Sequence, residues 1–139
     1  MNFKEKVDYL SMYQRKMAQI DAYAMERERW IAIGAKCTQS FGENGNGGGG
    51  TKTDNRIEKA AMMMLELSQK IEAEMELAIN DRDMIIETIR NKSKKQRYAE
   101  LLEWRFIGGL SNYKISNRIN KDVKTIQRIM RKAIDNLDL

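Results

Sequence analysis

Two long stretches of helical periodicity are the feature that most constrains the fold of this chain. Apolar residues recur every three to four positions over residues 3–37 and again from residue 54 to about residue 91, which is the spacing of an amphipathic helix. The 139 residues include no proline to interrupt either stretch. The two stripes are Phe3, Val7, Leu10, Met17, Ala24 and Ile31, then Ile57, Ala60, Ala61, Met64, Leu67, Ile71, Met75, Ala78, Ile85 and Ile89. We therefore predict an all-α protein in which residues 1–91 form a long antiparallel helical hairpin.

A glycine-rich segment separates the two predicted helices. Residues 42–53 hold most of the glycines, and this composition is typical of a flexible connection. Gly50-Thr51-Lys52-Thr53 superficially resembles a phosphate-binding loop, but the Gly-Lys-Ser/Thr order and a preceding buried strand are both missing. We interpret residues 42–53 as the loop of the hairpin, with Thr53 and Asp54 capping the second helix.

The run Met62-Met63-Met64 widens the apolar face of the second long helix beyond what one partner helix covers. Methionine side chains adapt to irregular packing, so we interpret the run as packing surface rather than a ligand site. A second chain or the C-terminal domain could cover the surplus. We expect a homodimer through the helical hairpin.

Positive charge is concentrated in the last third of the chain. Residues 92–139 hold 12 Lys and Arg against 5 Asp and Glu, whereas residues 1–91 hold 13 against 15, so all of the net charge of +5 comes from the C-terminal part. A basic end on a near-neutral body favours a bound polyanion. We place a domain boundary after residue 91, with a helix from residue 94 or 95 to residue 107 that Gly108 and Gly109 terminate.

The last forty residues have the pattern of a helix-turn-helix. Ser111 is a suitable N-cap, Asn120 tolerates the left-handed conformation of a tight turn, and Asp122 is a second N-cap. The helix over residues 122–137 then has one apolar stripe: Ile126, Ile129, Met130, Ala133, Ile134 and Leu137. Residues 92–139 are therefore predicted to form a three-helix DNA-binding domain whose last helix enters the major groove. At this size the domain needs support from the hairpin.

Two sets of residues are candidates for DNA contact. Arg and Lys side chains donate to guanine, and Gln pairs with adenine, near the start of a recognition helix. The predicted base-contacting residues are Lys124, Thr125, Gln127 and Arg128. The predicted phosphate-contacting residues are Ser111, Asn112, Tyr113, Lys114, Arg118, Lys121 and Arg131.

Catalysis and metal binding find little support in the composition. The chain has no histidine and a single cysteine, Cys37, so an internal disulfide is excluded and a Cys/His zinc site is not expected. Asp81, Asp83 and Glu87 are interpreted as a solvated helix face. We expect no enzymatic activity, no cofactor and no metal. No apolar run reaches the roughly 20 residues of a membrane span, and no secretory signal is evident, so we expect a cytoplasmic protein.

Residues 97–111, from Arg97 through Trp104-Arg105-Phe106 to Leu110-Ser111, resemble the start of region 4 of sigma-70-type factors. The segment from Asp122 to Arg128 is similar to the start of that family's recognition helix, and the resemblance implies base contacts for Lys124, Thr125, Gln127 and Arg128. Ser116 stands where the family usually has alanine, and Asn120 where it usually has glycine. Over nearly its full length the chain resembles ArpU- and RinA-like regulators of phages and prophages, which implies a phage-derived DNA-binding transcriptional regulator.

Two other interpretations stay open. Small phage DNA-packaging subunits, such as small terminases, also combine a helix-turn-helix with an oligomerising helical hairpin. Alternatively, the region resembling sigma region 4 binds RNA polymerase rather than DNA.

Overall fold

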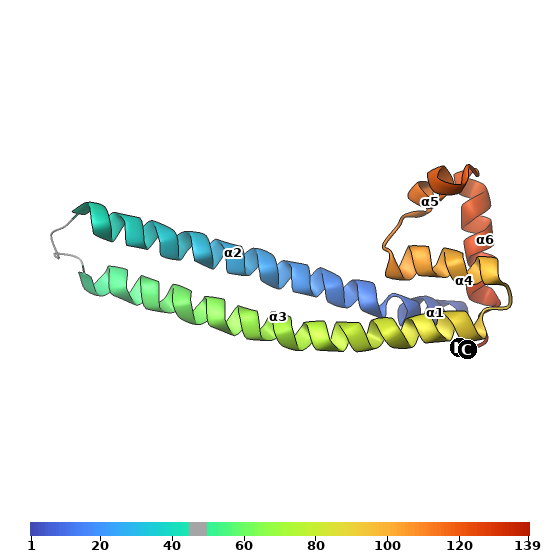
Figure 1. The fold of residues 1–139 in the computed structure, drawn as a ribbon, viewed down its shortest axis with the longest axis horizontal. Helices are drawn as coiled ribbons and strands as arrows, with labels where there is room; N and C mark the ends of the chain where they lie inside the picture. The colour runs from blue at the N-terminus through green and yellow to red at the C-terminus, as the bar shows by residue number, and fades with distance from the viewer. Residues whose placement is uncertain (45–49) are drawn as a thin grey trace. The chain divides into compact units, whose positions relative to one another are not determined.

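The protein is all-α in the computed structural model, which describes the backbone of residues 1–44 and 50–139 and the side chains of residues 1–37 and 55–139 (Figure 1). No strand occurs in those backbone segments. The elements are α1 (Phe3–Leu10), α2 (Met12–Asn44), α3 (Gly50–Lys92), α4 (Gln96–Leu102), the π-helical turn η1 (Glu103–Ile107), α5 (Asn112–Ile119) and α6 (Val123–Asp135). The all-α prediction is confirmed.

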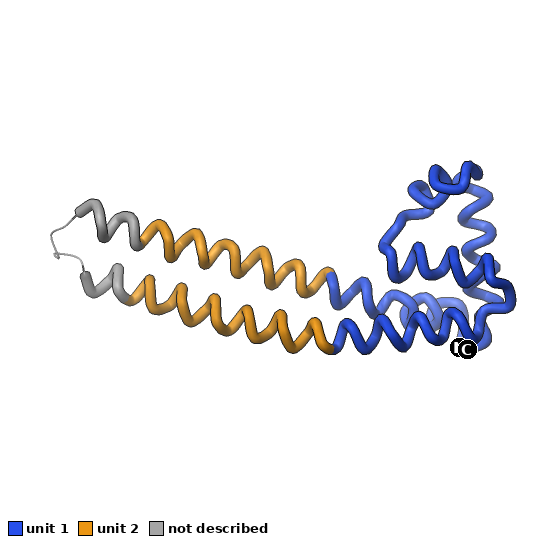
Figure 2. Tube along the Cα trace, in the orientation of Figure 1, with its two compact units in different colours: residues 1–17, 77–139 blue, residues 18–76 orange. Residues whose placement is uncertain are grey.

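The chain divides into two compact units (Figure 2). Unit 1 contains residues 1–17 and 77–139, and unit 2 contains residues 18–76. The boundary expected after residue 91 is therefore wrong, because the two ends of the predicted hairpin belong to the unit that holds the C-terminal helices. The two units are described separately below.

Unit 2 consists of the antiparallel pairing of α2 with α3. Three printed contacts run in opposite directions along the two helices, joining Trp30 to Lys59, Arg27 to Ser68 and Tyr23 to Lys70. Ile20, Ala60 and Leu67 are buried on the facing surfaces, and Gly34 lies opposite Ala60, where a methyl group on Gly34 would meet the Ala60 Cβ at 3.5 Å. The predicted helical hairpin is present in this unit.

The apolar stripes drift away from the helix contact. Ile31, Ala61 and Met75 were predicted in the stripes but are exposed. Leu10, Met17, Ala24 and Ile31 repeat every seven residues, and a straight helix drifts by about 20° per heptad relative to that repeat. After three heptads Ile31 has rotated out of the contact.

Three helix boundaries differ from those predicted. The single helix expected over residues 3–37 is divided at Ser11, whose N–H bonds to Tyr9 O and Val7 O at the end of α1. At the glycine-rich segment α2 continues to Asn44 and α3 begins at Gly50, so Thr53 and Asp54 lie inside α3 rather than at its cap. An N-cap contributes only about 1 kcal/mol, which does not prevent a helix from extending by one more turn. The flexible connection predicted at residues 45–49 lies outside the described residues, as do the side chains of 50–53, where the phosphate-loop resemblance falls.

Unit 1 is organised around one core to which almost every element contributes. Leu10 of α1 and Ile85 and Ile89 of α3 are fully buried together with residues of the C-terminal helices. Those residues are Leu101, Leu102, Phe106, Ile115, Ile126, Met130, Ala133, Ile134 and Leu137. The expectation that the hairpin supports the C-terminal helices is confirmed for its ends, which supply part of the core.

The helix expected from residue 94 or 95 to residue 107 is present but changes character at Glu103. Residues Gln96–Leu102 are α-helical, and Glu103–Ile107 form a π-helical turn that Gly108 N–H closes on Glu103 O at 2.8 Å. A methyl group on Gly108 would lie 2.9 Å from Trp104 O. Gly109 follows with φ +72°, the left-handed conformation predicted for the helix end.

Candidate nucleic-acid interface

The helix-turn-helix is formed by α5, a short turn and α6. Ser111 caps α5, because its hydroxyl accepts from Lys114 N–H at 3.2 Å. Asn120 takes the left-handed conformation at φ 54° and ψ 46°, and Lys121 N–H bonds to Ser116 O at 3.0 Å. Asp122 holds the extended N-cap conformation before α6, but its side chain makes no capping hydrogen bond. The two predicted cap positions and the turn residue are confirmed, while the capping bond expected from Asp122 is absent.

One face of α6 is buried and the opposite face is open. Ile126, Met130, Ala133 and Ile134 enter the core of unit 1. Lys124, Gln127 and Arg128 are exposed, whereas Thr125 is half-buried. Because 124 and 128 are four residues apart, Lys124 and Arg128 lie one above the other on the helix. The structure thus brings the four predicted base-contacting residues onto the first two turns of α6, with three of them fully accessible.

The start of α5 presents a second polar surface. Tyr113 is 64% exposed, and Lys114 and Ser111 are exposed as well. Asn112 is half-buried, and its Oδ1 atom is covered without a hydrogen-bond partner. Amides at a helix start favour anions, so this end of α5 suits a phosphate with Asn112 as the least accessible of the predicted contacts.

The remaining predicted cations, Lys121, Arg118 and Arg131, are all exposed, but two of them rest on aromatic rings. The Arg118 guanidinium lies 5.0 Å from the ring centroid of Trp104. The Arg131 guanidinium lies 5.2 Å from the ring centroid of Phe3. A cation–π contact of this kind contributes about 0.5–1 kcal/mol at an exposed site. Both rings therefore restrict a side chain that would otherwise sample many rotamers.

The N-terminal helix supports the end of α6, which sequence reasoning missed. Lys6 Nζ donates to the carbonyl oxygen of Asp135 at 3.0 Å, and Lys6 is buried. Asp135 is the last residue of α6, so the ammonium group stabilises the partial negative charge at the helix C-terminus. Phe3 and Lys6 lie one turn apart on α1, a spacing visible in the sequence, but nothing in the sequence links them to a helix more than 120 residues away.

A second missed contact supports the entry to the helix-turn-helix. Gln14 Nε2 donates to Ile107 O at 3.0 Å, at the end of η1. A methyl group on Gly109 would lie 3.4 Å from the Gln14 amide atoms. Gln14 therefore packs directly on the backbone that leads into α5.

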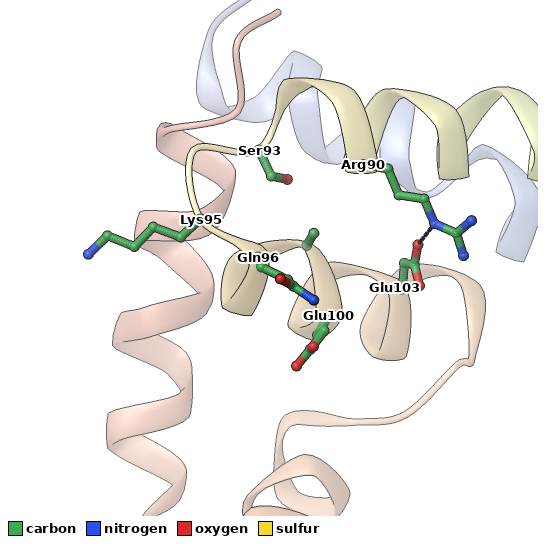
Figure 3. A pocket seen from close by; sticks show the side chains of 7 residues that line it. Arg90, Ser93, Lys95, Gln96, Glu100 and Glu103 are labelled. Atoms are coloured by element: carbon green, nitrogen blue, oxygen red, sulfur yellow. Dashed lines mark hydrogen bonds and ion pairs between the residues drawn. The ribbon is translucent and has the colours of Figure 1, made fainter.

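Beside the helix-turn-helix, a hollow of about 470 Å³ lies between the end of α3 and α4. Figure 3 shows Arg90 and Glu103 meeting at one side of it, where Arg90 Nε and Glu103 Oε1 are 2.7 Å apart. Its charged side chains are of both signs, namely Arg90, Lys95, Glu100 and Glu103. This mixture does not create a surface of one charge, so we assign the hollow no part in polyanion binding.

The acidic residues of α3 differ from one another in their surroundings. Asp81 pairs with Lys16 at 3.2 Å, and both side chains are largely buried, so interpreting Asp81 as part of a solvated face was wrong. Asp83 lies 3.5 Å from Arg82, and Glu87 is exposed. Among the described residues, no cluster of three or more acidic or cysteine side chains is arranged to hold a metal ion. No helix in the described part of the chain is both long and apolar enough to cross a bilayer.

Comparison of the chain with protein-family models, curated proteins and solved structures found no match in any of the three.

Proposed function

We propose that the protein is a DNA-binding transcriptional regulator that places α6 in the major groove of duplex DNA. The observation that carries the proposal is the division of α6 into a buried apolar face and an open face bearing Lys124, Gln127 and Arg128. A helix needs this division to be held rigidly by its domain while its polar side chains reach base edges.

The proposed contacts divide into base readout and phosphate binding. Arg128 donates two hydrogen bonds to guanine O6 and N7, and Gln127 pairs with adenine N6 and N7. Lys124 and Thr125 reach either a base or the adjacent phosphate. The start of α5, with Ser111 and Tyr113, holds a phosphate and fixes the register of α6 on the duplex.

Several cations add affinity without sequence preference. Lys114, Arg118, Lys121 and Arg131 are exposed, and each phosphate that such a group neutralises releases a condensed counterion. Trp104 and Phe3 hold two of these guanidinium groups in place before DNA arrives, which reduces the entropy lost on binding.

The family assignment is part of the same proposal. We propose that the protein is a phage-derived regulator of the ArpU and RinA type, with residues 97–130 similar to sigma region 4. Its support is the sequence resemblance, together with the Ser111 cap, the left-handed Asn120 and the exposed face of α6.

The test is selection of bound duplexes from a random or genomic pool, followed by affinity measurement at two salt concentrations. We expect a recovered motif, and we expect Gln127→Ala/Arg128→Ala to reduce the preference for that motif by at least tenfold, since each good bidentate contact contributes about 1–3 kcal/mol of discrimination. The matched control is Gln96→Ala/Arg97→Ala, because Gln96 and Arg97 are an exposed Gln-Arg pair on α4 of the same unit.

Three outcomes would contradict the proposal in different ways. Binding with a steep salt dependence and no motif would leave only phosphate contact. Equal loss in the α4 control would show that discrimination does not depend on α6. Capture of RNA polymerase without DNA, or a large ring in solution, would favour the polymerase-binding or packaging interpretation instead.

A further inference from the structure

An unpartnered apolar patch lies on α3 in unit 2, on the side away from α2. Met62 is 70% exposed and Leu65 is 61% exposed. The groove around them is lined by Asn55, Glu58, Lys59, Met62, Met63, Leu65, Glu66 and Gln69, all on α3. We call these residues the α3 patch. The face that packs on α2 carries the buried Ala60 and Leu67 instead, so the α3 patch has no covering element among the described residues of unit 2.

The α3 patch has the spacing of one turn of a coiled-coil seam. Met62 and Leu65 occupy positions three residues apart, as the two core positions of a heptad do. Lys59 and Glu66 are seven residues apart, so they lie on the same flank of that seam, one before and one after the apolar pair. The opposite flank carries the small, exposed Ala61, which allows a second helix to approach closely.

We propose that the α3 patch binds the α3 patch of a second copy of this chain, in antiparallel orientation. In that orientation a two-fold axis crosses α3 near Met63, and Met62 packs on the partner's Leu65. Positions of the same flank meet across an antiparallel seam, so Lys59 faces the partner's Glu66 and Glu66 faces the partner's Lys59. A two-fold axis produces each contact twice, as an isologous interface requires.

Charge complementarity is what identifies the occupant as a second copy. The apolar pair is bounded by one cation and one anion that are arranged to match themselves after a two-fold rotation. A partner with one sign of charge would be attracted by one end of the α3 patch and repelled by the other. A parallel second copy leaves Lys59 and Glu66 without this mutual contact.

The structure also shows that Lys59 is partly pre-positioned. Its ammonium group lies 5.6 Å from the ring centroid of Trp30 on α2, which restricts the long side chain before association. The apolar area is limited to one heptad, and interfaces of that size belong to the weak, concentration-dependent class. The inference does not depend on DNA binding.

The first test measures mass against concentration by analytical ultracentrifugation of the full chain. We expect an equilibrium between one chain of 16.2 kDa and twice that mass, and we expect Met62→Ser and Leu65→Ser each to weaken it by about tenfold, because each removes most of an apolar contact. Met25→Ser is the matched control, since Met25 is 62% exposed on α2. A wild-type chain that stays monomeric at all concentrations would overturn the proposal.

The second test determines the orientation by exchange of charge. Lys59→Glu places two glutamates together at each end of the seam, and Glu66→Lys places two lysines there, so each single change should weaken the dimer. The double variant Lys59→Glu/Glu66→Lys restores both pairs and should recover dimerisation. Arg29→Glu, at an exposed position of α2, controls for net charge, and circular dichroism checks that each variant remains helical. A double variant as weak as the single variants would rule out the antiparallel register.

Discussion

Gly109 shows how a single residue sets the direction of the chain into the helix-turn-helix. Its φ of +72° lies in the left-handed region, which costs a residue with a Cβ atom about 1–2 kcal/mol. The Gln14 amide lies against the same position, so a side chain there is both strained and crowded.

We therefore expect Gly109→Ala to lower the free energy of unfolding of unit 1 by about 1–2 kcal/mol. Denaturant titration followed by Trp104 fluorescence, in a Trp30→Phe background, measures this directly. Gly34→Ala is the comparison, because Gly34 is inside α2 and a methyl group there makes an ordinary 3.5 Å contact. That change should be neutral or stabilising by up to about 1 kcal/mol. A loss of stability in both variants would contradict the role given to the left-handed conformation.

At the scale of elements, α1 is the support on which α6 rests. It supplies Leu10 to the core, Lys6 to the carbonyl end of α6 and the Phe3 ring to Arg131. The break at Ser11 separates α1 from α2, so the two need not share one axis and α1 can follow the surface of α6. The proposed interface accordingly depends on the first ten residues, although none of them belongs to the helix-turn-helix.

We expect Phe3→Leu to weaken DNA binding by about two- to fivefold, since the cation–π contact contributes about 0.5–1 kcal/mol. Phe3→Tyr keeps an aromatic ring and should bind as the wild type does. Fluorescence anisotropy with a labelled duplex at low salt gives both affinities, and the free energy of unfolding of each variant is measured alongside. If Phe3→Leu and Phe3→Tyr bind equally, the ring does not position Arg131.

At the scale of the whole molecule, the shared core makes the C-terminal helices dependent on the ends of the hairpin. Leu10, Ile85 and Ile89 come from outside residues 92–139 and are fully buried in unit 1. Each unit also contains one tryptophan, Trp104 in unit 1 and Trp30 in unit 2. The unfolding of the two units can therefore be followed separately.

Leu10→Ala should destabilise unit 1 by about 2–5 kcal/mol, the usual cost of a large-to-small change in a core. We expect the transition reported by Trp104 to move to lower denaturant and the transition reported by Trp30 to move much less. Two backgrounds, Trp30→Phe and Trp104→Phe, provide the separate signals. Leu77→Ala is the control, because Leu77 is 49% exposed in the same unit. An equal shift of both transitions would mean that the units unfold as one.

Local features of the sequence predicted the fold class, the hairpin and the helix-turn-helix. The Ser111 cap, the left-handed Asn120 and the apolar stripe of α6 depend on residues within about four positions of one another. The same short-range periodicity placed Lys124, Gln127 and Arg128 on the open face of α6, as the structure shows. Their contacts with DNA stay a prediction.

Only the tertiary structure decided which elements support that helix and where the units divide. Phe3 reaches Arg131, Lys6 reaches Asp135 and Gln14 reaches Ile107 across 93 to 129 residues of chain. Nothing in the local pattern of either partner identifies the other, because such contacts arise when helices pack and bury a common core. The break at Ser11, the π-helical turn and the membership of Leu10, Ile85 and Ile89 in unit 1 follow from that packing, and helical periodicity alone does not encode them.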